Sequence, residues 1–201
     1  MNTFLKIAIT TLCAFITCKA YETCRCPRER YLNGLPDYME YQSAKDFLTS
    51  NETLYLKYLT ITAPLLGKQC VTSTLREPPL TFPEIARWLW YTDATRGKKR
   101  QKKAITLTMT NETCFTSQDF PTIGTVFPIV YCDFKCMIHY ILQESAFGQR
   151  GCALWVKASS KDNRLLHCEL IYNFFCETSY QIVYKKDTCD ELVPDSEKHS
   201  G

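Results

Sequence analysis

Hydrophobic and polar positions alternate with a period of two through the central part of the chain. Ile105, Leu107 and Met109 alternate with threonines, and Leu54 and Leu56 alternate with a tyrosine and a lysine. Alternation of this kind is typical of a strand with one face in a core and the other toward water. Segments with this character, joined by turn-rich links, predict eight strands: 54–61, 69–75, 86–91, 105–110, 113–117, 125–131, 136–142 and 152–158.

A helical period precedes these strands. Asp37 and Glu40 have the spacing of a capping box, in which two side chains bond the free backbone N–H groups at the start of a helix. Ala44 and Leu48 then fall on one helical face. The pattern predicts a short helix from Tyr38 to Leu48.

A second helical period follows the eighth strand, with Asp162 or Asn163 as its N-terminal cap. Leu166, Leu170 and Phe174 recur at helical spacing, so we expect them to form the apolar stripe that packs against the strands. A short ninth strand is predicted over residues 180–184.

The order helix, eight strands, helix favours an antiparallel barrel or sandwich and is the layout of a lipocalin. Pro128 falls within the sixth strand, which is therefore expected to be irregular there. An eight-stranded barrel is just wide enough to hold one small ligand. The prediction is a mainly β protein: an eight-stranded antiparallel lipocalin barrel with a short N-terminal helix and a C-terminal helix.

The first twenty residues have the anatomy of a secretory signal peptide. Lys6 gives a positive start, residues 7–17 are apolar, and Cys18 and Ala20 are small residues at a cleavage site. A membrane-spanning helix needs about 20 apolar residues, so this stretch is too short. We expect residues 1–20 to be removed and residues 21–201 to form a single secreted, extracellular domain.

Cysteine usage fits an oxidising compartment. Cys13 and Cys18 leave with the signal peptide, and the remaining ten of the twelve cysteines are even in number. We therefore expect five disulfides and no free thiol. Asn51 and Asn111 each begin an N-glycosylation sequon, as expected of a secreted glycoprotein.

Charge and motifs narrow the function class. The formal charge is +3, and it falls close to +1 without the signal peptide, which gives no argument for nucleic acid or membrane partners. His139, His167 and His199 are far apart, and there is no Cys-x-x-Cys pair, nucleophile motif or Gly-rich phosphate loop. We expect a monomeric binding protein without catalytic activity, metal or cofactor.

Four landmarks in a fixed order resemble one family, the tick salivary lipocalins that include the histamine-binding proteins. The resemblance covers residues 37–192. Its landmarks are Pro64-Leu65-Leu66-Gly67 followed by Cys70, Asp133-Phe134-Lys135-Cys136, Cys152-Ala153-Leu154-Trp155, and the helix at Cys168 with the closing Cys189. The resemblance implies the disulfides Cys70–Cys189 and Cys136–Cys168, and we expect Cys152–Cys176 as a third. Four cysteines remain, which are Cys24, Cys26, Cys114 and Cys132. They can pair in three ways, and the choice stays open.

The resemblance also implies where a ligand would bind. Amine binders of the family place carboxylates at three barrel positions that here are Ala63, Met137 and Ala153. An ammonium group buried without a counter-charge loses several kcal/mol of hydration. The substitutions therefore disfavour histamine or serotonin as the ligand.

Basic residues in the strands favour an acidic amphiphile instead. Lipid-mediator binders of the family use a basic residue two positions before the first barrel cysteine, which here is Lys68, and His139 is a second candidate. Lys57, Arg87 and Lys157 are further basic groups in the strands, and any of these side chains could instead face solvent. The ligand's apolar chain is expected to lie among four side chains: Leu56, Tyr58, Leu107 and Trp155.

Two features leave alternatives open. Trp88 and Trp90 share one strand face and either line the barrel or pack outside it. The basic run over residues 97–103 could bind a polyanion or be cleaved by a protease, but a solvated hairpin loop is the simpler interpretation.

Three functions are therefore considered. The first is sequestration of a small amphipathic host lipid such as a leukotriene or fatty acid, which would help evade host inflammation and haemostasis. The second is scavenging of biogenic amines, and the third is binding of a host immune protein through the loops.

Overall fold

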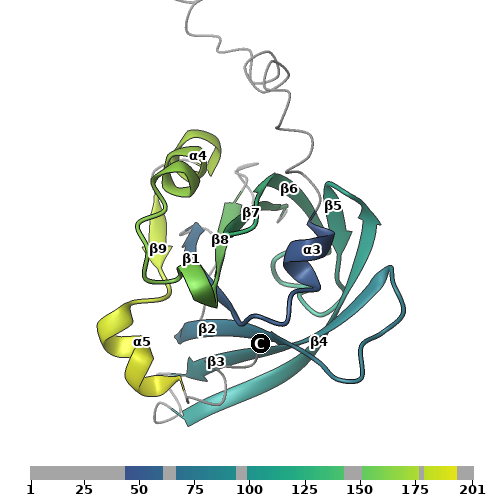
Figure 1. Cartoon of the computed structure of the whole chain (residues 1–201), viewed down its shortest axis with the longest axis horizontal. Helices are drawn as coiled ribbons and strands as arrows, with labels where there is room; N and C mark the ends of the chain where they lie inside the picture. The colour runs from purple at the N-terminus through teal and green to yellow at the C-terminus, as the bar shows by residue number, and fades with distance from the viewer. Residues whose placement is uncertain (1–43, 61–66, 94–98, 143–150, 177–178, 194–201) are drawn as a thin grey trace, which may run out of the picture. The chain divides into compact units, whose positions relative to one another are not determined.

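Nine antiparallel strands form one sheet in the order β2-β3-β4-β5-β6-β7-β8-β1-β9 (Figure 1). Because β1 also pairs with β2, the first eight strands close into a barrel, while β9 pairs with the second half of β1. The predicted eight-stranded antiparallel lipocalin barrel is thus confirmed. The structure is a computed structural model, and it describes residues 44–60, 67–93, 99–142, 151–176 and 179–193.

Each predicted strand has a counterpart whose limits lie within two residues of those expected, except that the fourth strand begins six residues earlier than expected. The strands are β1 (Leu54–Thr60), β2 (Lys68–Leu75), β3 (Glu84–Asp93), β4 (Lys99–Asn111), β5 (Cys114–Thr116), β6 (Val126–Cys132), β7 (Cys136–Ile141), β8 (Gly151–Lys157) and β9 (Tyr180–Ile182). The described helices are α3 (Lys45–Leu48), the 3-10 turn η4 (Ala158–Ser160), α4 (Leu166–Cys176) and α5 (Lys186–Leu192). None of these helices is long and apolar enough to cross a membrane.

Only residues 44–48 of the predicted N-terminal helix are described, and there α3 forms, with Phe47 and Leu48 buried. The capping box at Asp37 and Glu40 lies outside the described residues. The C-terminal segment contains a helix that the sequence pattern missed, α5, which carries Cys189.

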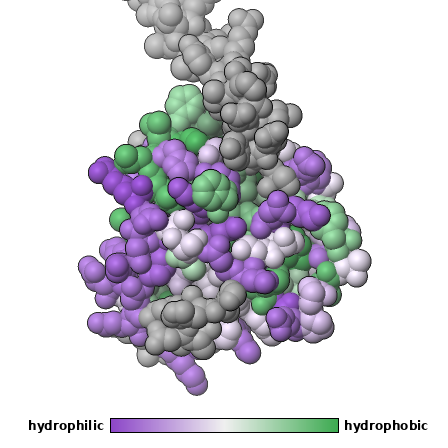
Figure 2. All heavy atoms as spheres, viewed as in Figure 1, coloured by the Kyte–Doolittle hydropathy of each residue, from purple (hydrophilic) through white to green (hydrophobic). Residues whose placement is uncertain are grey.

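Helix α4 is where predicted, but its predicted orientation is wrong. Leu166, Leu170 and Phe174 are 58%, 70% and 54% exposed, and hydrophobic side chains gather on the surface over this helix (Figure 2). The buried face instead contains Cys168 and Cys176, because both are tied by disulfides to strands of the barrel. The helix also begins three residues after Asn163, so neither proposed cap residue adjoins it.

Three disulfides staple the helices to the barrel: Cys70–Cys189, Cys136–Cys168 and Cys152–Cys176. These are the pairings expected from the sequence. Cys114 and Cys132 form no disulfide with another described residue. Because Cys24 and Cys26 lie outside the described residues, the expectation of five disulfides stays a prediction.

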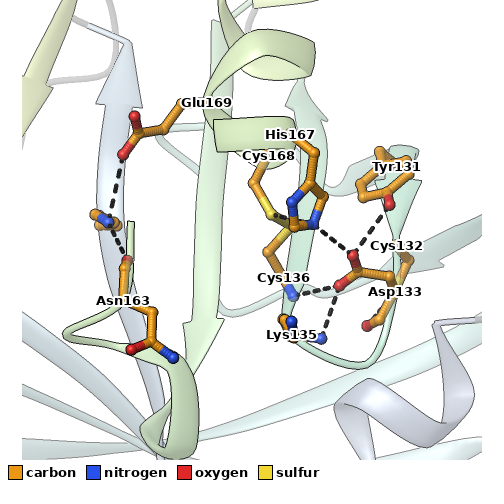
Figure 3. The surroundings of a disulfide bond; sticks show 10 residues. Tyr131, Cys132, Asp133, Lys135, Cys136, Asn163, His167, Cys168 and Glu169 are labelled. Atoms are coloured by element: carbon orange, nitrogen blue, oxygen red, sulfur yellow. Dashed lines mark hydrogen bonds and ion pairs between the residues drawn. A yellow bond between two sulfur atoms is a disulfide. The ribbon is translucent and has the colours of Figure 1, made fainter. Parts of the chain in front are cut away.

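The landmark around Asp133 has a structural explanation (Figure 3). One oxygen of the Asp133 carboxylate accepts the backbone N–H groups of Lys135 and Cys136, both at 2.7 Å, which fixes the turn between β6 and β7. The other oxygen lies 2.8 Å from His167 Nε2 at the start of α4 and also accepts the Tyr131 hydroxyl. This cluster therefore joins the turn to α4 beside the Cys136–Cys168 disulfide.

The central strands bear on two further expectations. Pro128 lies within β6, and the β6–β7 register shifts beside it, between Ile129 and Tyr131, as expected of an irregular strand. The part of the basic run that is described, residues 99–103, is strand and not loop, because it belongs to β4 and pairs with the end of β3. Residues 97 and 98 lie outside the described residues.

The two tryptophans of β3 lie on the outer face of the barrel. Lys102 Nζ lies 4.6 Å from the ring centroid of Trp88 and 5.4 Å from that of Trp90. Their neighbours Arg87, Leu89 and Tyr91 point the other way, into the barrel. The long antiparallel pairing of β3 with β4 brings the basic run and the tryptophans together.

Candidate functional site

The barrel encloses a cavity of about 290 Å³, at the small end of the range of about 300–1,000 Å³ common for ligand sites. Its apolar lining is Leu48, Leu54, Leu56, Leu59, Val71, Leu89, Ile105, Leu107, Phe115, Phe120, Ile123, Phe127, Met137, Ile141, Ala153 and Trp155. Its polar lining is Lys68, Ser73, Arg87, Tyr91, Lys103, Asp119, Thr122 and His139. At one end Leu48 of α3 lines the cavity. The opposite end, where β2 begins and β3 ends, is called the mouth here.

Three of the residues expected to contact the ligand's chain line the cavity: Leu56, Leu107 and Trp155. Tyr58 does not, because the β1–β8 register shifts between Leu56 and Tyr58. This bulge ends the simple alternation, so Leu59 faces the cavity in place of Tyr58. Tyr58 points outward, where its hydroxyl donates to Glu169 of α4 at 3.1 Å.

Arg87 lies at the α3 end of the cavity and is only 1% exposed. Its guanidinium donates to the backbone carbonyls of Leu48, Ser50, Glu52 and Ser73 and to the Ser73 hydroxyl. A guanidinium has five N–H donors, so this set of acceptors uses all of them. Burial lowers the pKa of Arg87 to about 9, which still leaves it charged at neutral pH.

His139 lines the middle of the cavity but supplies no positive charge there. Its Nδ1 lies 3.1 Å from the Tyr140 carbonyl oxygen, and its Nε2 accepts the indole N–H of Trp155 at 3.2 Å. Burial lowers the pKa of His139 to about 4, so the ring is neutral at pH 7. The hypothesis that His139 binds an acidic head group as a cation is therefore not supported.

Lys68 lies at the mouth and is half-buried. Its ammonium sits 5.4 Å from the centroid of the Tyr91 ring. Within the part of the chain that the structure describes, no carboxylate or carbonyl oxygen bonds this ammonium. Lys68, the first head-group candidate from the sequence, thus lies where an anionic head group would enter and has N–H donors to bind it.

The mouth also contains residues that sequence reasoning missed. The β5–β6 connection contributes Asp119, Phe120 and Ile123 to the lining. Asp119 accepts the Thr106 backbone N–H at 2.8 Å, and Lys103 donates to the Asp119 carbonyl. Phe120 and Ile123 are apolar residues in a connection whose other residues are typical of a turn. Their apolar character was the sequence signal that this connection contributes to the cavity.

The positions that carry acids in the family's amine binders can now be placed. Met137 and Ala153 both line the cavity, whereas Ala63 lies outside the described residues. Among the described lining residues, Asp119 is the single carboxylate.

The other two basic residues that the sequence singled out in the strands, Lys57 and Lys157, do not line the cavity. Lys57 pairs with Glu169 at 3.5 Å and Lys157 with Glu52 at 3.9 Å. Both sequon residues, Asn51 and Asn111, are exposed, as a glycosylated asparagine must be. Their glycosylation stays a prediction.

One side-chain group has the composition of a metal site: Asp133, Cys136, His167 and Cys168 (Figure 3). The two sulfur atoms are bonded to each other in a disulfide, so neither is available as a thiolate ligand. The group is therefore a structural anchor for α4.

Comparisons with known proteins agree with this geometry. Japanin from Rhipicephalus appendiculatus, in a crystal form bound to cholesterol, superposes with a TM-score of 0.57 at 17% identity, covering 68% of this chain and 93% of Japanin. Insecticyanin from the tobacco hornworm Manduca sexta gives a TM-score of 0.54 at 7% identity, covering 73% and 85%. Identities this low show the shared fold alone.

Among curated proteins, no sequence matches significantly. The model of the family described as "Tick histamine binding protein" matches residues 32–191, which is most of the chain. With its closed barrel and family disulfides, the chain belongs to the tick histamine binding protein family, a group of lipocalins.

Proposed function

We propose that this protein is a secreted lipocalin that sequesters a small amphipathic host lipid with an acidic head group, such as a fatty acid or a leukotriene. The lipid's apolar chain would lie in the cavity among Leu56, Leu107 and Trp155. Its carboxylate would bind Lys68 at the mouth. Removal of such a mediator from the bite site would dampen host inflammation and haemostasis.

The sign of the charge in the cavity is the observation that carries this proposal. The cavity is mostly apolar, but its polar lining includes two cations, Arg87 at one end and Lys68 at the other, besides Lys103 at the rim. The one described carboxylate in the lining, Asp119, already accepts the Thr106 N–H and the Ser117 hydroxyl. An anionic head group lowers the electrostatic energy of such a cavity, whereas a cation raises it.

Biogenic amines fit the same cavity poorly. Met137 and Ala153 offer no counter-charge, and an ammonium group near them would be repelled by the positive charges of Arg87 and Lys68. Cation–π contacts with the aromatic lining would return only about 0.5–2 kcal/mol each. We therefore expect weak binding of histamine and serotonin, although the family takes its description from histamine.

A second candidate is that the outer surface binds a host immune protein. The exposed apolar row Leu166, Leu170 and Phe174 on α4 favours it, because isolated soluble domains seldom expose such a row. In that case the cavity would be incidental.

Secretion rests on the predicted signal peptide, residues 1–20. N-terminal sequencing of protein secreted from eukaryotic cells should begin at Tyr21. Retention in the cell, or a first residue within the barrel, would contradict this assignment.

The deciding experiment exposes the secreted protein to a mixed pool of host lipids and amines and identifies what it retains by native mass spectrometry. Calorimetry then compares oleic acid, methyl oleate and histamine. We expect a retained acidic lipid, and oleic acid should bind more tightly than its uncharged ester. A retained amine would overturn the proposal in favour of amine scavenging. Retention of neither class would overturn it in favour of binding to a host immune protein.

A further inference from the structure

Cys70, near the start of β2, has an unusual backbone. It is the one non-glycine residue with a positive φ, 53°, in the described part of the chain. This left-handed conformation costs a residue with a Cβ atom about 1–2 kcal/mol. Such residues persist where the surroundings impose them, and they concentrate at binding sites.

The surroundings of Cys70 do impose its conformation. Its sulfur is bonded to Cys189 of α5, and its backbone N–H donates to the Val183 carbonyl at 3.2 Å. Its carbonyl accepts the guanidinium of Arg100, which also donates to the Thr72 hydroxyl at 2.6 Å. Cys70 is therefore fixed through its side chain, its N–H and its carbonyl.

The left-handed residue creates a bulge in the barrel. Between the paired positions Gln69 and Thr72, β2 contains Cys70 and Val71, whereas β3 has only Tyr91 opposite them. One extra residue is thus inserted in β2. A bulge whose first residue is left-handed normally has glycine at that place, but here the residue is a cysteine.

The bulge decides which side chains face the cavity. Side chains of a regular strand alternate, so residues three positions apart face opposite sides. Lys68 and Val71 are three apart, yet both line the cavity. Without the inserted residue, Val71 would keep its place in the cavity only if Lys68 turned outward and Gln69 turned in.

We propose that Cys70 is a positioning residue: its left-handed bulge, fixed by Cys189 and Arg100, turns the Lys68 ammonium into the mouth of the barrel. The left-handed backbone of Cys70, which the disulfide helps to impose, thereby sets the head-group selectivity of the cavity. This inference rests on the proposed function for its consequence in ligand binding, but the orientation of Lys68 is tested without a ligand.

The test compares three double variants that all lack the disulfide: C70G/C189A, C70A/C189A and C70V/C189A. Glycine accepts the left-handed conformation without cost, alanine less readily, and a β-branched residue least. The first readout is the ratio of the affinities for oleic acid and methyl oleate. We expect a wild-type ratio of about ten to a hundred, a similar ratio in the glycine variant, and a ratio close to that of Lys68→Ala in the valine variant.

The alanine variant should lie between these limits and carries the comparison if the valine variant does not fold. A ratio in the alanine and valine variants equal to that of wild type would overturn the proposal. Equal loss in the glycine variant would also overturn it, because the disulfide and not the backbone conformation would then be responsible.

The second readout is the acetylation rate of Lys68 measured by mass spectrometry, with the exposed Lys102 as internal reference. Lys68 should be protected in wild type and in the glycine variant and become more reactive in the alanine and valine variants. Unchanged labelling across the series would overturn the positioning role. If labelling changes as expected but wild type does not distinguish the acid from the ester, the positioning role stands and the proposed function fails.

Discussion

The two ends of the cavity each contain a cation, but the two cations are in opposite situations. Arg87 at the α3 end is 1% exposed and donates to four backbone carbonyls and a hydroxyl. Lys68 at the mouth is half-buried, rests over the Tyr91 ring and has no bonded oxygen among the described residues. Both line the cavity, yet only one has donors to offer a ligand.

This difference separates a charge that builds the scaffold from one that can recognise a ligand. The planar guanidinium has its donors in a fixed fork, which suits several carbonyl oxygens at once. Arg87 uses that fork to join the end of α3, through Leu48, and the segment after it, through Ser50, to β2 and β3. The lysine ammonium is flexible and compact, so it can remain unbonded until an anion arrives.

The largest expected effect is loss of stability on removal of the scaffold cation. Arg87→Met should lower the free energy of unfolding by about 3–5 kcal/mol, because several buried carbonyls lose their donor and each unsatisfied group costs about 1–3 kcal/mol. Urea unfolding followed by tryptophan fluorescence measures this. Arg87→Lys keeps the charge without the fork and should be destabilised nearly as much, whereas Lys68→Met should stay within about 0.5 kcal/mol of wild type. Similar stability for Arg87→Met and Lys68→Met would remove the distinction between the two ends.

The next effect concerns affinity and should appear only at the mouth. Lys68→Ala should weaken oleic acid binding about ten- to a hundred-fold, since a hydrogen bond to a charged group contributes about 1.5–3 kcal/mol. Binding of methyl oleate should hardly change, because its chain makes the same contacts in the cavity. Lys68→Arg is the matched control and should retain most of the affinity for the acid. Calorimetry that gives equal affinities of Lys68→Ala and wild type for the acid would exclude Lys68 as the head-group residue.

The sequence predicted the barrel well because its signals are local and repeated. The alternation at Ile105, Leu107 and Met109 marks a strand whichever partners it finds, and the cysteines fix how the helices attach. Cys70, far in sequence from Cys189, could be paired with it through the family resemblance, and the structure contains that bond.

The predictions that were wrong share a different cause. The direction in which a side chain points depends on tertiary contacts. Tyr58 was expected in the cavity, but one register shift in β1 turns it outward. Leu170 was expected in the core, but the disulfides of Cys168 and Cys176 turn the opposite helix face inward. The charge state of His139 depends on its burial, which no sequence pattern reports.

His139 lies between the two cations and sharpens the comparison through pH. Its pKa is lowered by burial to about 4 in the folded protein, against about 6.5 for an unperturbed histidine. Between these values the unfolded chain binds more protons, so stability is fully present above pH 6.5 and is lost as the pH falls toward 4. The expected loss from this group between pH 7 and pH 5 is about 2 kcal/mol.

Urea unfolding at both pH values measures that loss. His139→Gln keeps an acceptor for the Trp155 indole but does not titrate, so its stability should fall about 2 kcal/mol less over the same interval. An identical fall in wild type and His139→Gln would mean that the ring is protonated in the folded protein. At pH 5 the cavity would then contain a further cation, between Arg87 and Lys68.

The smallest effect should come from the ring beneath Lys68. The Tyr91 face lies 5.4 Å from the ammonium and restricts the flexible lysine side chain to the mouth before a ligand binds. A cation–π contact at a partly exposed site contributes about 0.5–1 kcal/mol, so Tyr91→Leu should weaken oleic acid binding only about two- to fivefold.

Tyr91→Phe is the matched control for this change. It keeps the aromatic face and loses only the hydroxyl, which donates to Gln101 at 3.3 Å and does not contact Lys68. We expect Tyr91→Phe to keep the wild-type affinity for the acid, Tyr91→Leu to lose part of it, and both to bind methyl oleate unchanged. This result would assign the effect to the ring and the charge. If Tyr91→Leu weakened the acid and the ester equally, the ring would contribute apolar contact to the ligand's chain and would have no part in holding Lys68.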